Sequence, residues 1–384
     1  MNEGVGIRGS QSSLREANSA SVVEAVRQYG QITQVELAAV TGLSQATVSN
    51  LVKNLQAAGV VETSATVRSG RRAQAVSLVR SSDLSVGVHI GRRRLDVLIA
   101  DASWSVTAHQ RFPLPVEHRF DTTLDRASML VAELAQQLGA SMNAVAAVGL
   151  AIPGATGMSS ESLIGWDQVE AASVLSRRLG RAVIPIREAD AVAVAEARFG
   201  ALRGVGSALV VRASSSTEAA IMMAGRPLEG LGRAAGAIGH MMSDPNGRIC
   251  RCGARGCLNT VVSQEALADL LRVTHGPLSL RAIVARANEG DPGCRQVIAH
   301  AASSIGSAVA DAATLLAPER ICVTGTLTEA GNLFLDALRM ALRARPLLPE
   351  PETLVVKGEC EDAEARGALA VASDSVSPLG GKEL

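Results

Sequence analysis

The chain contains few aromatic side chains. Tyr, Trp and Phe together make up 2% of its 384 residues, although 47% of the residues are hydrophobic. A packed core therefore has to be built mainly from Val, Leu, Ile and Ala. The length exceeds that of one small domain and predicts two or three.

The sequence also lacks long apolar runs. No stretch approaches the ~20 consecutive apolar residues that a membrane-spanning helix needs. The N-terminal stretch, MNEGVGIRGSQSSLREAN, has no apolar segment of the kind found in signal peptides. We therefore expect a cytoplasmic protein.

Cysteine is scarce, and its distribution argues against a disulfide framework. Three of the six cysteines lie within residues 250–257, whereas Cys294, Cys322 and Cys360 are far apart. This usage fits a reducing compartment. The three isolated cysteines are expected to be buried as small hydrophobic side chains.

The chain has no net charge, but its charges are unevenly spread. The first 80 residues contain eight basic and five acidic side chains, so the remainder is slightly acidic. A basic N-terminal part on an acidic body indicates a polyanionic partner for that part alone.

Three helices with clear start and stop signals are expected near the N-terminus. Apolar residues at helical spacing indicate a first helix over residues 14–29. Thr33 opens a capping box for a second helix, and a turn at Gly42 leads to Ser44, a good N-cap for a third helix over residues 45–57. Two helices joined by a tight glycine turn are typical of the helix-turn-helix.

A hairpin with a basic tip is expected after the third helix. Residues 60–68 and 73–79 are rich in Val, Thr and Ser, and the basic segment 69–72 joins them as in a wing. The start of the third helix would meet base edges in the major groove, while basic residues would meet phosphates. The residues expected to contact DNA are Ser44, Gln45, Thr47, Ser49, Asn50, Lys53, Arg71 and Arg72. The alternative is a helical hairpin used for protein contacts.

The most specific motif lies in residues 239–259, GHMMSDPNGRICRCGARGCLN. It places four metal-ligating side chains in one short segment: His240, Cys250, Cys252 and Cys257. A Cys₃His set satisfies the tetrahedral preference of Zn²⁺ and leaves no open position for water, so we expect one structural zinc ion per chain. Tight turns around an ion need residues that tolerate positive φ, and the segment supplies Gly247, Gly253 and Gly256. The alternative is three unrelated thiols beside a chance histidine.

This segment closely resembles the zinc loop of the ROK family (repressors, open reading frames, kinases), in which Gly-His precedes Cys-x-Cys-Gly-x-x-Gly-Cys-Leu-Glu. All four ligand positions match, whereas the final Glu is Asn259 here. Residues 14–79 resemble the winged helix-turn-helix that precedes the ROK domain in the family's transcription regulators. The likeness of the body runs from residue 82 to the last expected helix.

The motifs that serve ATP in ROK kinases are altered in this body. The stretch that resembles their Asp-x-Gly-x-Thr has His89 and Arg93 at the Asp and Thr positions. A second phosphate loop has four glycines in the kinases, and these positions are Ser214, Ser216, Glu218 and Ala220 here. His is a poor substitute for a carboxylate on Mg²⁺, and both the added Cβ atoms and the added negative charge oppose phosphate binding. We therefore expect neither sugar kinase activity nor strong ATP binding.

The sugar-binding side of the resemblance is reduced as well. Asp190 keeps the position of the kinases' general base, and it fits equally well as a cap of the following helix. Hydrogen-bonding groups of the family are replaced at Ala189, Val192, Ala237 and Asn259. The expected effector is therefore not plain glucose but a modified or phosphorylated sugar. Its expected contacts are Glu188, Asp190, His240 and Asn259.

Alternating strands and helices over this length predict an α/β fold. Residues 84–100 are expected to form two strands, and for the tip at Arg92, Arg93 and Arg94 a solvated turn is favoured over an anion site. Further strands are expected at 144–152, 183–186, 320–324 and 354–357, and helices at 122–138, 263–273, 280–287, 291–316, 332–343 and 363–373. The resemblance implies two actin-like (ribonuclease H-like) lobes. The expected divisions are a disordered arm (1–13), a winged helix-turn-helix (14–81), a ROK domain (82–374) with its zinc loop (239–259), and a flexible tail (375–384).

The sequence therefore predicts a DNA-binding transcriptional regulator of the ROK family, a repressor of carbohydrate-related genes that binds its operator as a homodimer or homotetramer. A sugar or sugar phosphate is the expected effector. One alternative is a body that serves only as an assembly scaffold without a small ligand. The other is a sugar kinase with an added DNA-binding arm, against which the replacements at residues 89, 93, 214, 216 and 218 argue.

Overall fold

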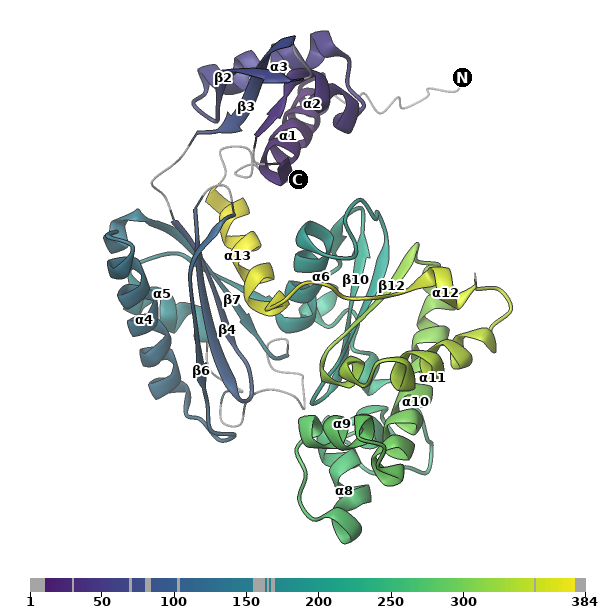
Figure 1. Ribbon diagram of the computed structural model, residues 1–384. Coiled ribbons are helices and arrows are strands. Elements are labelled where there is room, and N and C mark those ends of the chain that lie inside the picture. The colour runs from purple at the N-terminus through teal and green to yellow at the C-terminus, as the bar shows by residue number, and fades with distance from the viewer. Residues whose placement is uncertain are drawn as a thin grey trace, which may run out of the picture.

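A computed structural model describes residues 11–29, 31–68, 71–79, 84–101, 104–154, 163, 166, 170–348 and 350–376. A small N-terminal module precedes a body with two lobes, each built on a five-stranded sheet (Figure 1). The predicted α/β class is confirmed. Among the described residues, no helix combines the length and the apolar character needed to cross a bilayer.

The N-terminal module consists of three helices and a three-stranded antiparallel sheet in the order β1-β3-β2. The capping signals form as predicted: Thr33 and Glu36 bond each other's backbone amides, Gly42 adopts φ 68°, and Ser44 accepts a hydrogen bond from the Thr47 amide. The elements are α1 (Gln11–Tyr29), β1 (Gln31–Thr33), α2 (Gln34–Thr41), α3 (Gln45–Ala57), β2 (Val61–Arg68) and β3 (Arg71–Leu78). Helix α1 thus begins three residues before the expected position, and residues 1–10 of the expected arm lie outside the described residues.

The first lobe contains a sheet in the order β6-β5-β4-β7-β8. Helices α4 and α5 cover one face, and the last helix, α13, covers the other (Figure 1). The elements are β4 (Leu84–Ile90), β5 (Arg94–Ala100), β6 (Val106–Pro113), α4 (Phe120–Gln137), β7 (Val145–Ile152), α5 (Ala171–Leu179), β8 (Val183–Arg187) and α13 (Ala363–Val376). Strand β6 and helix α5 were not predicted.

The second lobe repeats this plan with the order β11-β10-β9-β12-β13. Helix α6 (Glu188–Phe199) packs on one face of the sheet, and a helical layer on the other face encloses the largest core. The strands are β9 (Ala208–Ala213), β10 (Thr217–Met223), β11 (Arg226–Pro227), β12 (Arg320–Thr324) and β13 (Val355–Lys357). The other helices are α7 (Asn259–Val262), α8 (Gln264–His275), α9 (Leu280–Asn288), α10 (Pro292–Leu316), α11 (Asn332–Arg343) and α12 (Pro351–Leu354). Each lobe has an antiparallel three-stranded meander followed by two parallel strands, as the two predicted actin-like lobes require.

The two lobes meet where α6 packs against α13. A Cβ atom added at Gly367 of α13 would lie 1.8 Å from the carbonyl oxygen of Ala191 in α6, and one added at Gly149 of β7 would lie 1.9 Å from that of Ala368. Only glycine permits such backbone contact. Helix α13 is therefore fixed against both the first sheet and α6.

Candidate functional site

Helix α3 of the N-terminal module has one buried and one exposed face. The buried face packs into the core of the module and consists of Val48, Leu51, Val52 and Leu55. Four residues expected to contact DNA are exposed: Ser44, Gln45, Asn50 and Lys53. Thr47 and Ser49 are half-buried, and the Thr47 hydroxyl lies 2.8 Å from that of Ser44 at the start of the helix. The polar face of α3 is thus open to solvent.

The predicted wing is the hairpin of β2 and β3. Arg68 pairs with Arg71 and Val67 with Arg72 across the two strands. Arg71 and Arg72 therefore belong to strand β3 and not to the connecting turn, which corrects the boundary drawn from the sequence. The remaining tip residues, 69 and 70, lie outside the described residues.

The predicted metal ligands come together in the second lobe. One ligand atom from each of His240, Cys250, Cys252 and Cys257 lies within 4.8 Å of all the others. Nδ1 of His240 is 3.7 Å from Sγ of Cys250, and Sγ of Cys252 is 3.6 Å from Sγ of Cys257. Metal–sulfur bonds of about 2.3 Å in a tetrahedron require ligand atoms ~3.7 Å apart. The donor set and its spacing therefore fit one tetrahedral metal ion.

The glycines of this loop serve different purposes. Gly253 and Gly256 adopt φ values of 91° and 70°, as predicted. A Cβ atom at Gly256 would also lie 1.6 Å from the carbonyl oxygen of Asp244. Gly247 has no positive φ, so the prediction is wrong for that residue.

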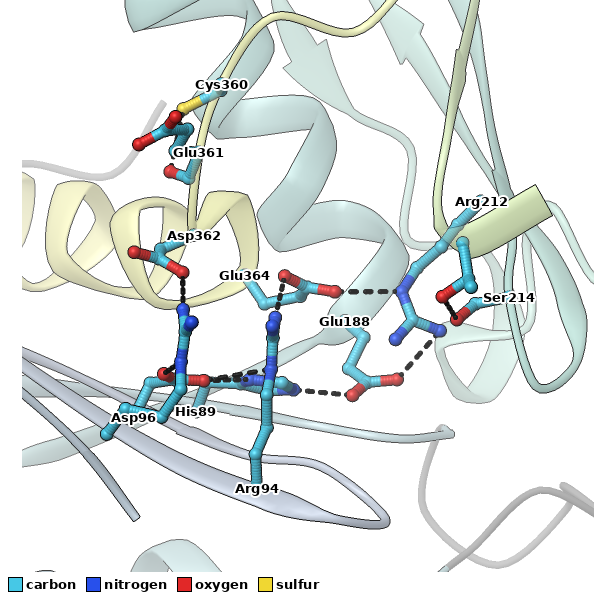
Figure 2. A network of polar contacts seen from close by, with 12 residues as sticks. His89, Arg94, Asp96, Glu188, Arg212, Ser214, Cys360, Glu361, Asp362 and Glu364 are labelled. Atoms are coloured by element: carbon cyan, nitrogen blue, oxygen red, sulfur yellow. Dashed lines mark hydrogen bonds and ion pairs between the residues drawn. The ribbon is translucent and has the colours of Figure 1, made fainter. Parts of the chain in front are cut away.

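A closed ring of ion pairs, four of whose six members are buried, lies between the lobes (Figure 2). Its members, in order around the ring, are His89, Glu188, Arg212, Glu364, Arg94 and Asp96. Cationic side chains alternate with carboxylates, which balances the charges when the histidine is protonated. Among the ring residues, His89 stands where the resemblance places the kinase Asp that serves phosphate and metal.

Two contacts of this ring cross between the lobes, His89 to Glu188 and Arg212 to Glu364. Nε2 of His89 in β4 lies 2.6 Å from Oε1 of Glu188 in α6. Arg212 in β9 lies 3.1 Å from Oε2 of Glu188 through Nη1, and 3.0 Å from Oε1 of Glu364 in α13 through Nε. Arg212 of the second lobe is thus bonded to both helices at the hinge.

The first lobe completes the ring. Arg94 lies 3.0 Å from both Glu364 and Asp96, and Nδ1 of His89 lies 3.3 Å from Oδ2 of Asp96. The other oxygen of Asp96 accepts a hydrogen bond of 2.7 Å from Arg111. Asp96 is fully buried, and these contacts supply it with three cationic partners.

These surroundings keep the ring charged. Burial lowers the pKa of His89, but the hydrogen bonds to Asp96 and Glu188 outweigh burial and raise it to about 9. Burial raises the pKa of Glu364, but the charges of Arg212, His89 and Arg94 outweigh burial and lower it to about 2. At neutral pH the ring therefore holds protonated and ionised groups in alternation.

The ring forms part of the wall of a cavity of about 750 Å³ between the lobes, which residues 214–216 of the altered phosphate loop also line. The basic residues of the ring are already bonded to carboxylates and offer no free charge to a phosphate. Glu218 lies opposite Arg212 across the β9–β10 pair. Its buried Oε2 has no hydrogen-bond partner among the described residues. The ring and Glu218 thus offer no free positive charge to a triphosphate.

Two sequence-based interpretations need correction. The tip at residues 92–94 is not simply solvated, because Arg92 lies 2.9 Å from Glu265 of α8 and Arg94 belongs to the ring, which leaves only Arg93 exposed. Asp190 is not the N-cap of α6, which is Arg187. Arg187 instead donates two hydrogen bonds, of 2.7 and 2.6 Å, to the Asp190 carboxylate.

The four residues expected to contact an effector already have partners within the chain. Glu188 belongs to the ring, Asp190 is paired with Arg187, and His240 belongs to the metal cluster. The Asn259 side chain bonds both the amide and the carbonyl of Thr217 at the start of β10, at 2.8 and 3.3 Å. Asn259 also lines a second cavity, of about 270 Å³, beside the metal-ligand loop.

Four charged residues in or beside the ring were not predicted from the sequence: Asp96, Arg111, Arg212 and Glu364. A usable signal exists for Asp96 and Arg212, since each interrupts an apolar strand, RLDVLIA or ALVVRA. A buried charge requires a partner. The closure of the ring could not be predicted from the sequence, because members that pair, such as Arg94 and Glu364, are separated by 270 residues along the chain.

The free energy of unfolding is expected to fall at alkaline pH because of His89. The pKa of about 9 in the folded chain lies above the ~6.5 of an unfolded histidine. Its contribution is therefore fully present below pH ~6.5 and is lost as the pH rises through 9. In His89→Gln, which cannot titrate, the decline should be smaller by about 3 kcal/mol. Urea denaturation at pH ~6 and ~9.5 measures the difference.

The matched control is His300→Gln, which replaces an exposed histidine on α10. It should keep the alkaline decline of the wild type. An equally steep decline in His89→Gln would show that His89 is not held in its protonated form.

Comparisons with known proteins agree with this architecture. The model of the ROK family matches residues 85–375, and the model of the MarR family matches residues 17–72. The DNA-binding transcriptional dual regulator NagC of Escherichia coli (strain K12) is 27% identical over 380 residues, covering 93% of this chain and 92% of NagC. The xylose repressor of Bacillus subtilis (strain 168) is 22% identical, covering 87% and 88%.

Solved structures show the same fold. A ROK family transcriptional regulator, a homologue of the E. coli MLC protein, superposes with a TM-score of 0.74 at 21% identity, covering 94% of this chain and 96% of that one. A ROK family glucokinase from Streptomyces griseus, in complex with glucose and AMPPNP, has a TM-score of 0.64 at 24% identity and covers 75% and 99%. The kinase thus matches a part of this chain about as long as the body alone. With a family model matched over most of its length, the chain belongs to the ROK family.

Proposed function

We propose that the chain is a cytoplasmic, sequence-specific transcriptional regulator that represses genes of carbohydrate metabolism. The exposed polar face of α3, held by two helix caps in a winged-helix module, carries this proposal. NagC is named as a regulator and the xylose repressor as a repressor, and both match along most of the chain. The match to the MarR family model over the N-terminal module supports it further.

In this proposal α3 enters the major groove. The amides of Gln45 and Asn50 suit adenine, and Lys53 suits a phosphate. Arg71 and Arg72 would contact the backbone or the minor groove from the wing. A homodimer or homotetramer would read half-sites separated by one helical turn, ~34–36 Å, or a multiple of it.

The body is proposed to act without sugar kinase activity. Phosphoryl transfer depends on positioned phosphates and a metal ion. In this chain the ring would occupy the place of the phosphates and the metal ion. Its cations are bonded to Glu188, Glu364 and Asp96. A sugar or sugar-phosphate effector would have to compete with the internal partners of Glu188, Asp190, His240 and Asn259. Those partners equally favour the second candidate, a body that serves as a scaffold without a small ligand.

The cluster at residues 240–257 is proposed to hold one structural Zn²⁺ ion. Three thiolates and one imidazole suit zinc, and the ligand spacing fits a tetrahedron. In zinc-finger peptides structural zinc contributes ~10–16 kcal/mol of apparent binding free energy, so losing one ligand should matter. Cys252→Ser should lower both the zinc content and the thermal stability, as metal analysis and melting curves measure.

Cys360→Ser is the control for the zinc site, because Cys360 is a free thiol outside the cluster. It should retain one zinc ion per chain. The proposal of a zinc site fails if metal analysis of freshly purified wild-type protein finds no zinc.

Specific DNA binding should depend on Asn50. Asn50→Ala is expected to lose ~1–3 kcal/mol of binding free energy on the preferred sequence if the amide contacts a base pair in bidentate fashion. Arg71→Ala should weaken binding to all sequences alike and flatten the salt dependence. Selection of genomic fragments by the purified protein, followed by titrations at several salt concentrations, measures both effects.

The matched control is Gln56→Ala, in the last turn of the same helix and also exposed. It should leave sequence preference unchanged, because reading helices contact bases through their N-terminal residues. The proposal fails if the wild-type protein prefers no genomic fragment over random DNA.

A further inference from the structure

Helices α6 and α13 run side by side from the ring toward the N-terminal module (Figure 1). Both begin at the ring, where Arg212 contacts Glu188 of α6 and Glu364 of α13. One turn further on, Gly367 touches the backbone of Ala191. The separation in sequence between Glu188 and Glu364 equals that between Ala191 and Gly367, so the two helices run parallel and are in direct contact. Such close backbone packing leaves little room for one helix to move without the other.

The far ends of the two helices meet the N-terminal module. Nη1 of Arg198, near the end of α6, lies 3.0 Å from Oδ1 of Asp374 in the last turn of α13. It also lies 3.9 Å from Oε2 of Glu24, which belongs to α1 of the DNA-binding module. Arg198 is ten residues after Glu188, or ~15 Å along a helix. One guanidinium group thus bridges the two hinge helices and the module.

Trp104 supports this guanidinium group. Its ring lies beneath Arg198, 4.5 Å from the guanidinium carbon, and stands edge-on to Phe199 at 5.3 Å. Its indole Nε1 donates a hydrogen bond of 2.7 Å to Ser373 of α13. Trp104 adopts φ 62°, which is unfavourable for a bulky residue. Such a conformation persists only where surrounding contacts enforce it.

We propose that Arg198 is a positioning residue, through which the α6–α13 pair holds the DNA-binding module against the body and couples it to the ring. This inference rests on the proposed function as a DNA-binding regulator. A ligand that competes with Arg212 for Glu188 or Glu364 would shift the start of either helix. The shift would reach Glu24 through Arg198, about 15 Å away, without any contact between ligand and DNA.

The first test replaces Arg198 in the full-length chain. Arg198→Ala should weaken binding to a genomic fragment that the wild type selects by roughly tenfold, a coupling of ordinary size between distant sites. Arg198→Lys keeps the positive charge but neither the paired bonds to Asp374 nor the stacking on Trp104, so it should restore only part of the affinity. The control is Arg203→Ala, which removes an exposed arginine five residues further along and should have no effect.

The second test is a double-mutant cycle with the ring. When Arg198 is present, Glu364→Gln should change the affinity of the full-length chain for DNA. In the Arg198→Ala background the same substitution should have no effect. The control is Glu361→Gln, an exposed carboxylate three residues before Glu364. A merely structural role of Arg198 would give additive effects, because independent local losses add.

Fluorescence gives a readout that is independent of DNA. The chain has two tryptophans, so Trp166→Phe leaves Trp104 as the sole emitter. In that background Glu364→Gln should shift the Trp104 emission, and Glu361→Gln should not. Circular dichroism confirms that each variant is folded.

The possible outcomes separate the two proposals. If the wild type selects no DNA, the proposed function fails, and the fluorescence test alone decides the coupling. If the wild type selects DNA but Arg198→Ala binds it equally well, or if the double-mutant effects are additive, the coupling through Arg198 is wrong while the proposed function stands.

Discussion

The buried pairing of Arg212 with Glu188 and Glu364 is the contact on which the arrangement of the two lobes depends. Arg212 is 9% exposed and Glu188 is 3% exposed, so neither charge has water as a substitute partner. Buried ion pairs often add little net stability, but removing one partner costs ~3–5 kcal/mol because the other charge remains buried and unpaired. The ring therefore selects one relative position of the lobes rather than simply stabilising the fold.

This constraint links the features of the body. The ROK glucokinase from Streptomyces griseus was solved in complex with glucose and AMPPNP. In this chain side chains from β4, β5, β9, α6 and α13 join the two lobes directly. The metal-ligand loop lies in the same lobe as Arg212, and Asn259 fixes its end to the first residue of β10. Contacts within the chain thus organise the second lobe from the loop to the ring.

The sequence predicted the elements better than it predicted the site. Capping boxes, glycine turns and apolar periodicity are local signals, and they located the start of α2 and both ends of α3, α4, α8, α9, α10 and α11 within two residues. Strand β6 was missed because it is an edge strand with a half-exposed alternating pattern. The metal ligands were predictable because they lie within one short segment. The ring was not, because its members come from five elements spread over the chain, and only tertiary packing brings them together. Asp190 was misread for a different reason: its partner Arg187 is only three residues away but belongs to no family motif, and it donates two hydrogen bonds to the carboxylate.

If the ring takes the place of the nucleotide, the full-length protein should neither bind ATP nor phosphorylate a sugar. Calorimetric titration with ATP and Mg²⁺, together with a coupled phosphorylation assay over a panel of hexoses, measures both. We expect no binding heat at ATP concentrations up to about 1 mM, a limit that corresponds to only ~4 kcal/mol of binding free energy, and no turnover. Micromolar binding of ATP, or phosphorylation of any hexose, would show instead that the ring opens to admit a nucleotide.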